Sequence, residues 1–190
     1  MVRMKSILLT LSLLVIAVGA TAEASTLRKG PYIIYPNNNT EMTVLWQADE
    51  TPGASYIEWG TTTGYGNSSG PLTESGNGTD EHQFTYVIPG LTPGTRYYYS
   101  VTVDSQQVAG SFMAAPEESV NSVSFYAYGD TRTIPATHDS VLDAALNNVD
   151  TDPNPDQVQT VMLHAGDWIS SDIESDWQTE YFNRSYANTL

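Results

Sequence analysis

The sequence predicts two domains, an all-β antiparallel sandwich followed by the opening βαβ unit of an α/β domain. Between residues 29 and 115, short runs alternate apolar and polar residues and are separated by Gly, Pro, Asn and Ser. From residue 123 the pattern changes to longer apolar runs with a helical segment between them. A chain of 190 residues is long enough for one or two domains.

The amino terminus is typical of a secretory signal peptide. Arg3 and Lys5 precede an apolar run of 14 residues, and the small-residue sequence Ala22-Glu23-Ala24 follows. A membrane-spanning helix needs about 20 residues, which makes an uncleaved anchor the weaker alternative. We therefore expect residues 1–24 to be removed and the protein to be secreted, extracellular or periplasmic, with no membrane association after cleavage.

Seven short strands are expected in residues 25–116. Met42, Val44 and Trp46 share one face of a strand by the period of two. The stretch 60–78 is rich in Gly, Thr, Ser and Asn and should be a loop with room for one edge strand. The other strands are expected at residues 32–35, 41–47, 56–59, 84–88, 96–103 and 111–114. This spacing without a helical period predicts a sandwich.

Four aromatic residues of this region admit two interpretations. They are either core residues, which we favour, or a platform for a sugar. These residues are Trp46, Trp59, Tyr97 and Tyr99.

After a polar linker at residues 116–119, one βαβ unit is expected. Residues 123–128 form a continuous apolar run, which predicts a strand buried on both faces. A helix is expected near residues 138–147, capped by Thr137 or Asp139. Its apolar side would carry Val141, Leu142, Ala145 and Leu146. Residues 158–163 form the second strand, parallel to the first.

Both of these strands end in Gly-Asp, which predicts a metal site. In an open α/β sheet the carboxyl ends of adjacent strands form the ligand crevice, so Asp130 and Asp167 should meet there. Two close carboxylates repel unless a cation lies between them, and hard metal ions accept oxygen ligands. The alternative is a Rossmann-like sheet whose acidic residues cap helices or bind ribose.

Several motifs resemble known families. Trp46 and the turn Leu91-Thr92-Pro93-Gly94-Thr95-Arg96-Tyr97 resemble fibronectin type III domains, in which the Tyr hydroxyl donates to upstream backbone. Lys29-Gly30-Pro31-Tyr32 looks like the start of the sandwich that precedes the catalytic domain in purple acid phosphatases. Tyr128-Gly129-Asp130 and His164-Ala165-Gly166-Asp167-Trp168 resemble the first two signature blocks of calcineurin-like metallophosphoesterases.

The resemblance implies a dinuclear metal site and hydrolysis of phosphate esters. It assigns one metal to Asp130 and a bridging role to Asp167, and it implies divalent metal ions, two of them, drawn from Mn, Zn or Fe. The domains would be a fibronectin type III-like domain at 25–116 and the N-terminal part of a metallophosphoesterase domain at 117–190. The family's remaining Asn and His ligands would lie beyond Leu190, so this fragment alone is expected to be inactive.

Two positions depart from the family pattern. Arg132 stands where the first block often has His, and Ser170 stands where purple enzymes have the Tyr that binds ferric iron. We therefore expect a colourless site without a tyrosinate–ferric pair.

Other polar residues near the motifs have competing interpretations. Arg132 either clamps a phosphate oxygen or pairs with Asp139 or Asp167. His138 either faces the crevice as a catalytic residue or is structural, and His164 is expected in packing or behind the metal ligands. The aromatic residues Trp177, Tyr181 and Phe182, at helical spacing, are expected in a core.

The charge excludes some partners. With 7 Lys and Arg against 22 Asp and Glu, the chain has a net charge of −15, which repels nucleic acid and anionic membranes. No cysteine is present, so disulfides are excluded. A phosphate ester is the expected substrate. The rival functions are an extracellular binding or adhesion module with a non-catalytic α/β appendage, and a nucleotide-binding domain, although no Walker loop is present.

Overall fold

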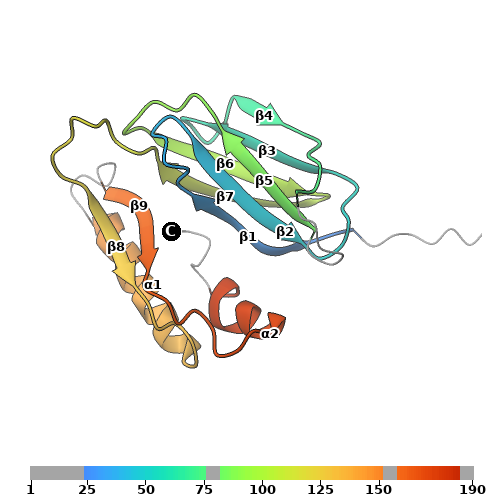
Figure 1. Ribbon diagram of the computed structural model, residues 1–190. Helices are drawn as coiled ribbons and strands as arrows, with labels where there is room; N and C mark the ends of the chain where they lie inside the picture. Colours follow the sequence, from blue (N-terminus) through green and yellow to red (C-terminus); the bar gives the residue numbers. More distant parts are fainter. Residues whose placement is uncertain (1–23, 76–81, 152–157, 185–190) are drawn as a thin grey trace, which may run out of the picture.

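The computed structural model describes residues 24–75, 82–151 and 158–184, which form a β-sandwich with a smaller strand–helix–strand unit beside it (Figure 1). The expected signal peptide lies outside the described residues except for Ala24. Within the described ranges, no helix is both long enough and apolar enough to cross a membrane.

Seven antiparallel strands form the two sheets of the sandwich, as the alternating pattern predicts. One sheet has the order β1-β2-β5 and the other β4-β3-β6-β7. The strands are β1 (Leu27–Ile34), β2 (Met42–Ala48), β3 (Ser55–Gly60), β4 (Asn67–Ser69), β5 (Gln83–Ile88), β6 (Arg96–Val103) and β7 (Gln106–Met113). The N-terminal part of the chain is therefore all-β.

The core lies between the two sheets. Alternate residues of β2 are buried, and Trp46 is completely inaccessible to solvent. Its ring stacks on Phe84 with centroids 5.6 Å apart, and its indole N–H donates to the Ser55 hydroxyl at 3.0 Å. Trp59, Tyr97 and Tyr99 are also buried. Their burial confirms the core interpretation and contradicts a sugar platform.

Two strands begin five residues earlier than the sequence indicates. β7 starts at Gln106 because a tight turn at Asp104 pairs its polar first residues with β6, from Val103↔Gln106 onward. β1 starts at Leu27, which pairs with Ala48. Backbone pairing, which alternation does not report, sets both of these ends.

In the turn around Tyr97, the donor and acceptor of the hydrogen bond are exchanged relative to the expectation. The backbone N–H of Thr92 donates to the Tyr97 hydroxyl oxygen at 3.0 Å. The expectation that Tyr97 donates to upstream backbone is therefore wrong for this contact, because a phenol oxygen also accepts and the Thr92 N–H points to it.

The C-terminal unit consists of a parallel strand pair and helices. Strands β8 (Ser124–Tyr128) and β9 (Val158–His164) pair in parallel, with Tyr128 opposite His164, and α1 (Pro135–Thr151) connects them. Short helical turns α2 (Glu174–Asp176) and η2 (Trp177–Phe182) follow. Helix α1 begins at Pro135, so the predicted caps Thr137 and Asp139 are wrong. Proline suits this position because the first helical N–H needs no partner.

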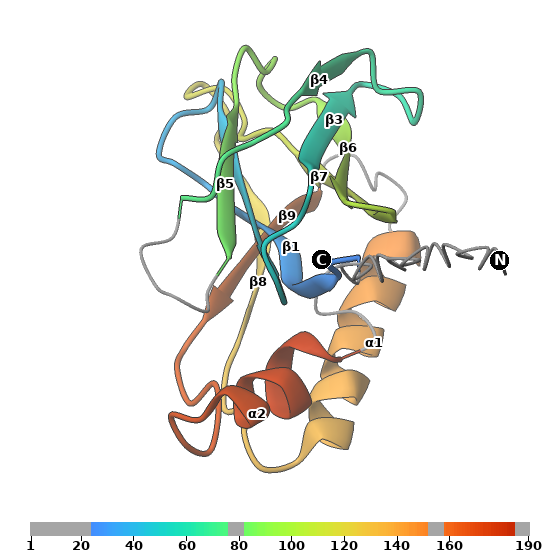
Figure 2. The ribbon, with the colours of Figure 1, turned by 90° about the vertical axis from the view of Figure 1, so that its right-hand side faces the viewer.

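The expectation that the first strand of this unit is buried on both faces is wrong. Phe125 and Leu163 are 51% exposed, and Val123 is 50% exposed. Helix α1 packs on the other face, where it buries Leu142 and Ala145 (Figure 2). One helix covers only one side of a strand pair, which explains the exposed side.

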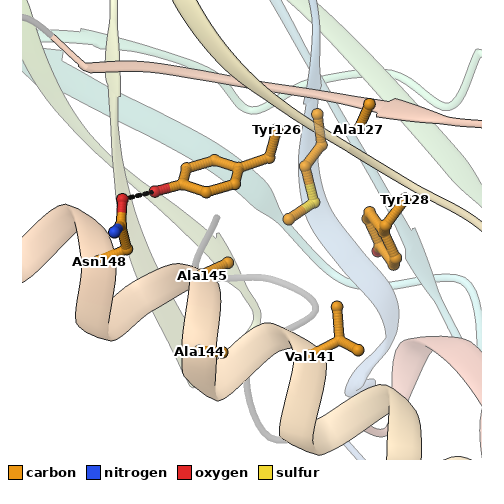
Figure 3. Close-up of a pocket in the computed structure, with 8 residues that line it drawn as sticks. Tyr126, Ala127, Tyr128, Val141, Ala144, Ala145 and Asn148 are labelled. Atoms are coloured by element: carbon orange, nitrogen blue, oxygen red, sulfur yellow. Dashed lines mark hydrogen bonds between the residues drawn. The ribbon is translucent and has the colours of Figure 1, made fainter.

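A groove of about 330 Å³ runs between α1 and this strand pair (Figure 3). Its walls are mainly apolar, and Tyr126 spans it by donating a hydrogen bond to Asn148 Oδ1 at 2.7 Å. The lining residues are Tyr126, Ala127, Tyr128, Val141, Ala144, Ala145, Asn148 and Met162. None of these lining residues carries a charge.

Polar contacts join the two parts of the chain. Glu174 pairs with Arg28 at 2.9 Å and with Lys29 at 2.8 Å, both from β1. Gln178 Nε2 donates to the Arg28 carbonyl at 3.0 Å. The rings of Tyr32 and Phe182 also lie 5.8 Å apart. These contacts place η2 against the edge strand of the sandwich.

Candidate metal centre

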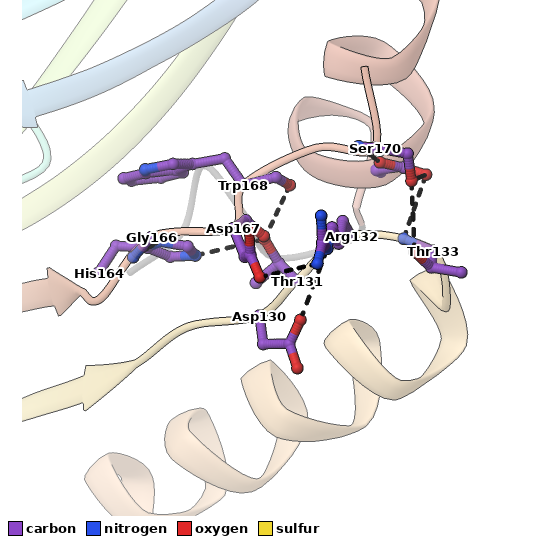
Figure 4. A network of polar contacts seen from close by, with 10 residues as sticks. Asp130, Thr131, Arg132, Thr133, His164, Gly166, Asp167, Trp168 and Ser170 are labelled. Atoms are coloured by element: carbon purple, nitrogen blue, oxygen red, sulfur yellow. Dashed lines mark hydrogen bonds and ion pairs between the residues drawn. The ribbon is translucent and has the colours of Figure 1, made fainter.

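The two Gly-Asp turns lie side by side at the ends of β8 and β9 (Figure 4). Backbone bonds continue the pairing beyond the strands: Asp130 N donates to the Gly166 carbonyl and Thr131 N to the Asp167 carbonyl, each at 3.0 Å. A Cβ on Gly129 would lie 3.1 Å from that of Ala165, so small residues let the two turns approach. The backbone therefore brings Asp130 and Asp167 to one edge of the sheet.

Both aspartates adopt a left-handed backbone conformation, with φ of 58° at Asp130 and 56° at Asp167. This region is unusual for residues other than Gly, although Asp and Asn tolerate it best. Strained backbone of this kind clusters at functional sites.

A single guanidinium group contacts both carboxylates. Arg132 Nη2 lies 3.1 Å from Asp167 Oδ2, and Arg132 Nε lies 3.9 Å from Asp130 Oδ1 (Figure 4). The side chains of Asp130 and Asp167 are 82% and 52% exposed. Of the alternatives for Arg132, the structure has the pair with Asp167, while Asp139 pairs with Arg184 at 3.3 Å.

Behind the aspartates, Thr131 and His164 support the turns. Thr131 is buried, and its hydroxyl donates to the Trp168 carbonyl at 2.9 Å and lies 3.2 Å from His164 Nε2. Gly166 N donates to His164 Nδ1 at 3.2 Å, which assigns the proton of the neutral ring to Nε2. Burial and the nearby His138 lower the pKa of His164, which favours this neutral form. The packing interpretation of His164 is thus confirmed.

Aromatic rings surround His164. It stacks on Trp168 with centroids 3.6 Å apart and meets the edge of Tyr128 at 4.9 Å. Trp168 contacts Tyr181 in turn, at 4.8 Å. The expected core of Trp177, Tyr181 and Phe182 exists as a half-buried cluster.

Glu180 joins the two loops that carry the aspartates, and the sequence analysis did not find it. Its carboxylate accepts from Ser170 N at 2.6 Å, from Ser170 Oγ at 2.7 Å and from Thr133 N at 3.1 Å. The Ser170 hydroxyl bond, the backbone N–H bonds and the Arg132 charge together lower the pKa of Glu180, against the effect of burial. One acidic residue in a helical segment carries no local signal for such a role.

His138 is buried in the packed cluster and does not contact the aspartates through any bond among the described residues. Its Nδ1 lies 3.0 Å from the Glu180 carbonyl, and its Nε2 lies 3.4 Å from the Tyr128 hydroxyl. With both ring nitrogens engaged, His138 ties α1 to η2. This arrangement supports the structural interpretation and not a catalytic residue facing the crevice.

The donor set fits a hard cation in part. Two carboxylates converge on one positive group, and the guanidinium shows that a cation can contact both. Among the described residues, however, no three His, Asp or Glu side chains gather into a metal-binding group. The described site can therefore supply two oxygen ligands, and a closed metal site needs others.

Comparison with known protein families gives a match for the N-terminal part of the chain. The family described as purple acid phosphatase, N-terminal domain, matches residues 29–132, more than half of the chain. The match includes the sandwich and extends through β8 to Asp130 and Arg132. No curated protein matches the chain. The chain thus belongs to the purple acid phosphatase N-terminal domain family.

Proposed function

We propose that this chain supplies the first part of a secreted, metal-dependent phosphoesterase that hydrolyses phosphate esters. The observation that carries the proposal is the convergence of Asp130 and Asp167 on one cationic group at the ends of parallel strands. Membership of the purple acid phosphatase N-terminal domain family supports the phosphatase class.

Asp130 and Asp167 would hold the metal ions, with further ligands from sequence beyond Leu190. When bound, the metals polarise the phosphoryl group and lower the pKa of a bound water. Backbone pairing of the two Gly-Asp turns keeps the two aspartates at one edge of the sheet. Glu180 and Thr131 hold the loops in that position.

Arg132 would bind a phosphate oxygen. Its side chain is 45% exposed and its guanidinium contacts both carboxylates, so a substrate anion at this edge can reach it. Arginine suits this task because its planar fork donates two parallel hydrogen bonds to an oxyanion. Ser170 is engaged with Glu180, which supports a site without a tyrosinate–ferric pair.

The test is hydrolysis of p-nitrophenyl phosphate with added Mn²⁺, by protein that includes the natural sequence following Leu190. Asp130→Asn and Asp167→Asn should each lower kcat/KM by about 100-fold or more, because each removes a ligand charge worth several kcal/mol in the transition state. Asp172→Asn, an exposed aspartate in the same region, is the charge-matched control.

Full metal-dependent activity in either ligand variant would refute the proposal. So would a following sequence without His-bearing ligand blocks, which would favour the binding-module function instead.

A further inference from the structure

The first described residues suggest a processing site and a receptor for the new amino terminus. Ala24 is exposed, whereas the next residue, Ser25, is only 3% exposed. The backbone nitrogen of Ser25 donates to Asp104 Oδ2 at 2.8 Å. We propose that hydrolysis of the Ala24–Ser25 bond releases the leader and that the new Ser25 α-ammonium forms a half-buried ion pair with Asp104. The inference does not depend on phosphoesterase activity.

Several hydrogen-bond acceptors surround Ser25. Its hydroxyl shares one hydrogen between two acceptors, Asp49 Oδ1 at 3.0 Å and the Glu50 carbonyl at 2.9 Å. The neighbouring Thr26 donates to Asp49 through its backbone N–H and its hydroxyl, each at 2.7 Å. Two side chains and one backbone carbonyl therefore fix the residue that would become the amino terminus.

Asp104 is prepared to accept a charged group. It lies in the turn between β6 and β7, and its other oxygen accepts from Ala54 N at 3.0 Å. The backbone bonds from Ser25 and Ala54 lower its pKa, so it is ionised at neutral pH. The carboxylate thus links the start of β1, the loop before β3 and the β6–β7 turn.

Cleavage changes the chemistry of this contact. Water adds across the Ala24–Ser25 peptide bond, the leader departs with the new Ala24 carboxylate, and the Ser25 amine takes up a proton. A neutral N–H donor becomes an ammonium with three donors, and charge-assisted hydrogen bonds are about twice as strong as neutral ones. Among the described residues, the carboxylates in contact with Ser25 are those of Asp104 and Asp49.

The stability that the Ser25 ammonium adds should depend on pH in one direction. An α-amino group ordinarily has a pKa of about 7.7 to 8.0, and the adjacent carboxylates raise that pKa in the folded state. The added stability is therefore complete below about pH 7.7 and is lost as the pH rises through the folded pKa. An uncleaved chain has no amine at this position and should lack the transition.

The first experiment is amino-terminal sequencing of the protein secreted from a host with a signal peptidase. Ser25 is the expected first residue. Any other amino terminus overturns the proposed processing site.

The second experiment compares the melting temperatures of a chain that begins at Ser25 with a chain that carries Gly-Ala before it. At pH 7 the free-amine chain should melt about 2 to 4 °C higher. The difference should disappear in Asp104→Asn, which keeps an acceptor and tolerates the positive φ of 49° at this position. It should persist in Asp143→Asn, an exposed aspartate of α1.

A third experiment needs no substitution: the Ser25 amine is acetylated and the melting temperature is measured again. Acetylation removes the charge while every side chain stays in place, so the acetylated chain should melt with the extended one. Equal melting temperatures of the free-amine and acetylated chains at pH 7, or a difference that survives Asp104→Asn, would overturn the ion pair.

Discussion

At the scale of single residues, Arg132 supplies the positive charge that contacts both carboxylates of the candidate metal centre. Its guanidinium lies 3.1 Å from Asp167 and 3.9 Å from Asp130, and it offsets the repulsion between the two carboxylates. A metal ion at this position would compete with that positive charge.

Replacement of Arg132 by Ala should tighten Mn²⁺ binding to the chain by about 1.4- to 5-fold, the factor that corresponds to an exposed ion pair of about 0.2 to 1 kcal/mol. Isothermal titration or electron paramagnetic resonance at fixed ionic strength measures it. Arg184→Ala removes the same charge from a pair with Asp139 and should leave the affinity unchanged. Unchanged or weaker binding in Arg132→Ala would show that the guanidinium does not compete with the metal.

A second residue-scale contact lies in the sandwich core, where the Trp46 indole N–H donates to the Ser55 hydroxyl at 3.0 Å. Ser55→Ala leaves this donor buried without an acceptor and should lower the free energy of unfolding by about 1 to 3 kcal/mol. Urea denaturation measures the change, with Ser68→Ala on the exposed strand β4 as the control. Equal midpoints for the two variants would contradict this assignment.

At the scale of elements, α1 is the part that covers the β8–β9 pair. Leu142 is 1% exposed on the face that meets the strands, whereas its neighbour Val141 is 41% exposed. A strand pair with one covered face depends strongly on the few apolar side chains that cover it.

Leu142→Ala should therefore destabilise the C-terminal unit by about 2 to 5 kcal/mol, through lost burial and the cavity that remains. Hydrogen exchange should show faster exchange in α1 and β9, while β2 in the sandwich keeps its protection. Val141→Ala, with a half-exposed side chain, should have a small effect. Uniform acceleration in both parts would mean that the chain unfolds as one unit.

At the scale of the whole molecule, Glu174 connects the sandwich with the C-terminal unit. Burial acts to raise the pKa of Glu174, but hydrogen bonds from Lys29 and Gln178 and the charges of Lys29 and Arg28 outweigh it, so the pKa is lowered. Its side chain is 41% exposed, and solvent screening therefore limits the strength of the two ion pairs.

The lowered pKa sets the direction of the pH effect. The Glu174 contribution is present above the ordinary glutamate pKa, near pH 4.3, and is lost as the pH falls through the lower folded pKa. We expect hydrogen exchange in α2 and η2 to accelerate as the pH falls below about 4, after correction for the intrinsic rate. Glu174→Gln should produce the same loosening at pH 7, and Glu118→Gln in the exposed linker should not. A linkage that is equally tight in both variants would contradict this role.

The sequence predicted the elements whose side chains report their environment directly. Alternation along residues 41–47 predicted the buried face of β2, and the polar stretch at 60–78 predicted a loop with an edge strand. The order of β8, α1 and β9 was also predictable, because periodicity and turn residues are local properties. Backbone pairing was not, which is why the first residues of β1 and β7 were missed.

The sequence also predicted that Asp130 and Asp167 lie at the same edge of the sheet, because the carboxyl ends of neighbouring parallel strands lie there. Only the tertiary structure decided what surrounds them. Arg132 contacts both carboxylates, and His138 is buried against the Glu180 carbonyl. Glu180 in turn binds the backbone of Thr133, which lies 47 positions earlier in the chain. Such contacts depend on how whole elements pack, and no local pattern of residues encodes that packing.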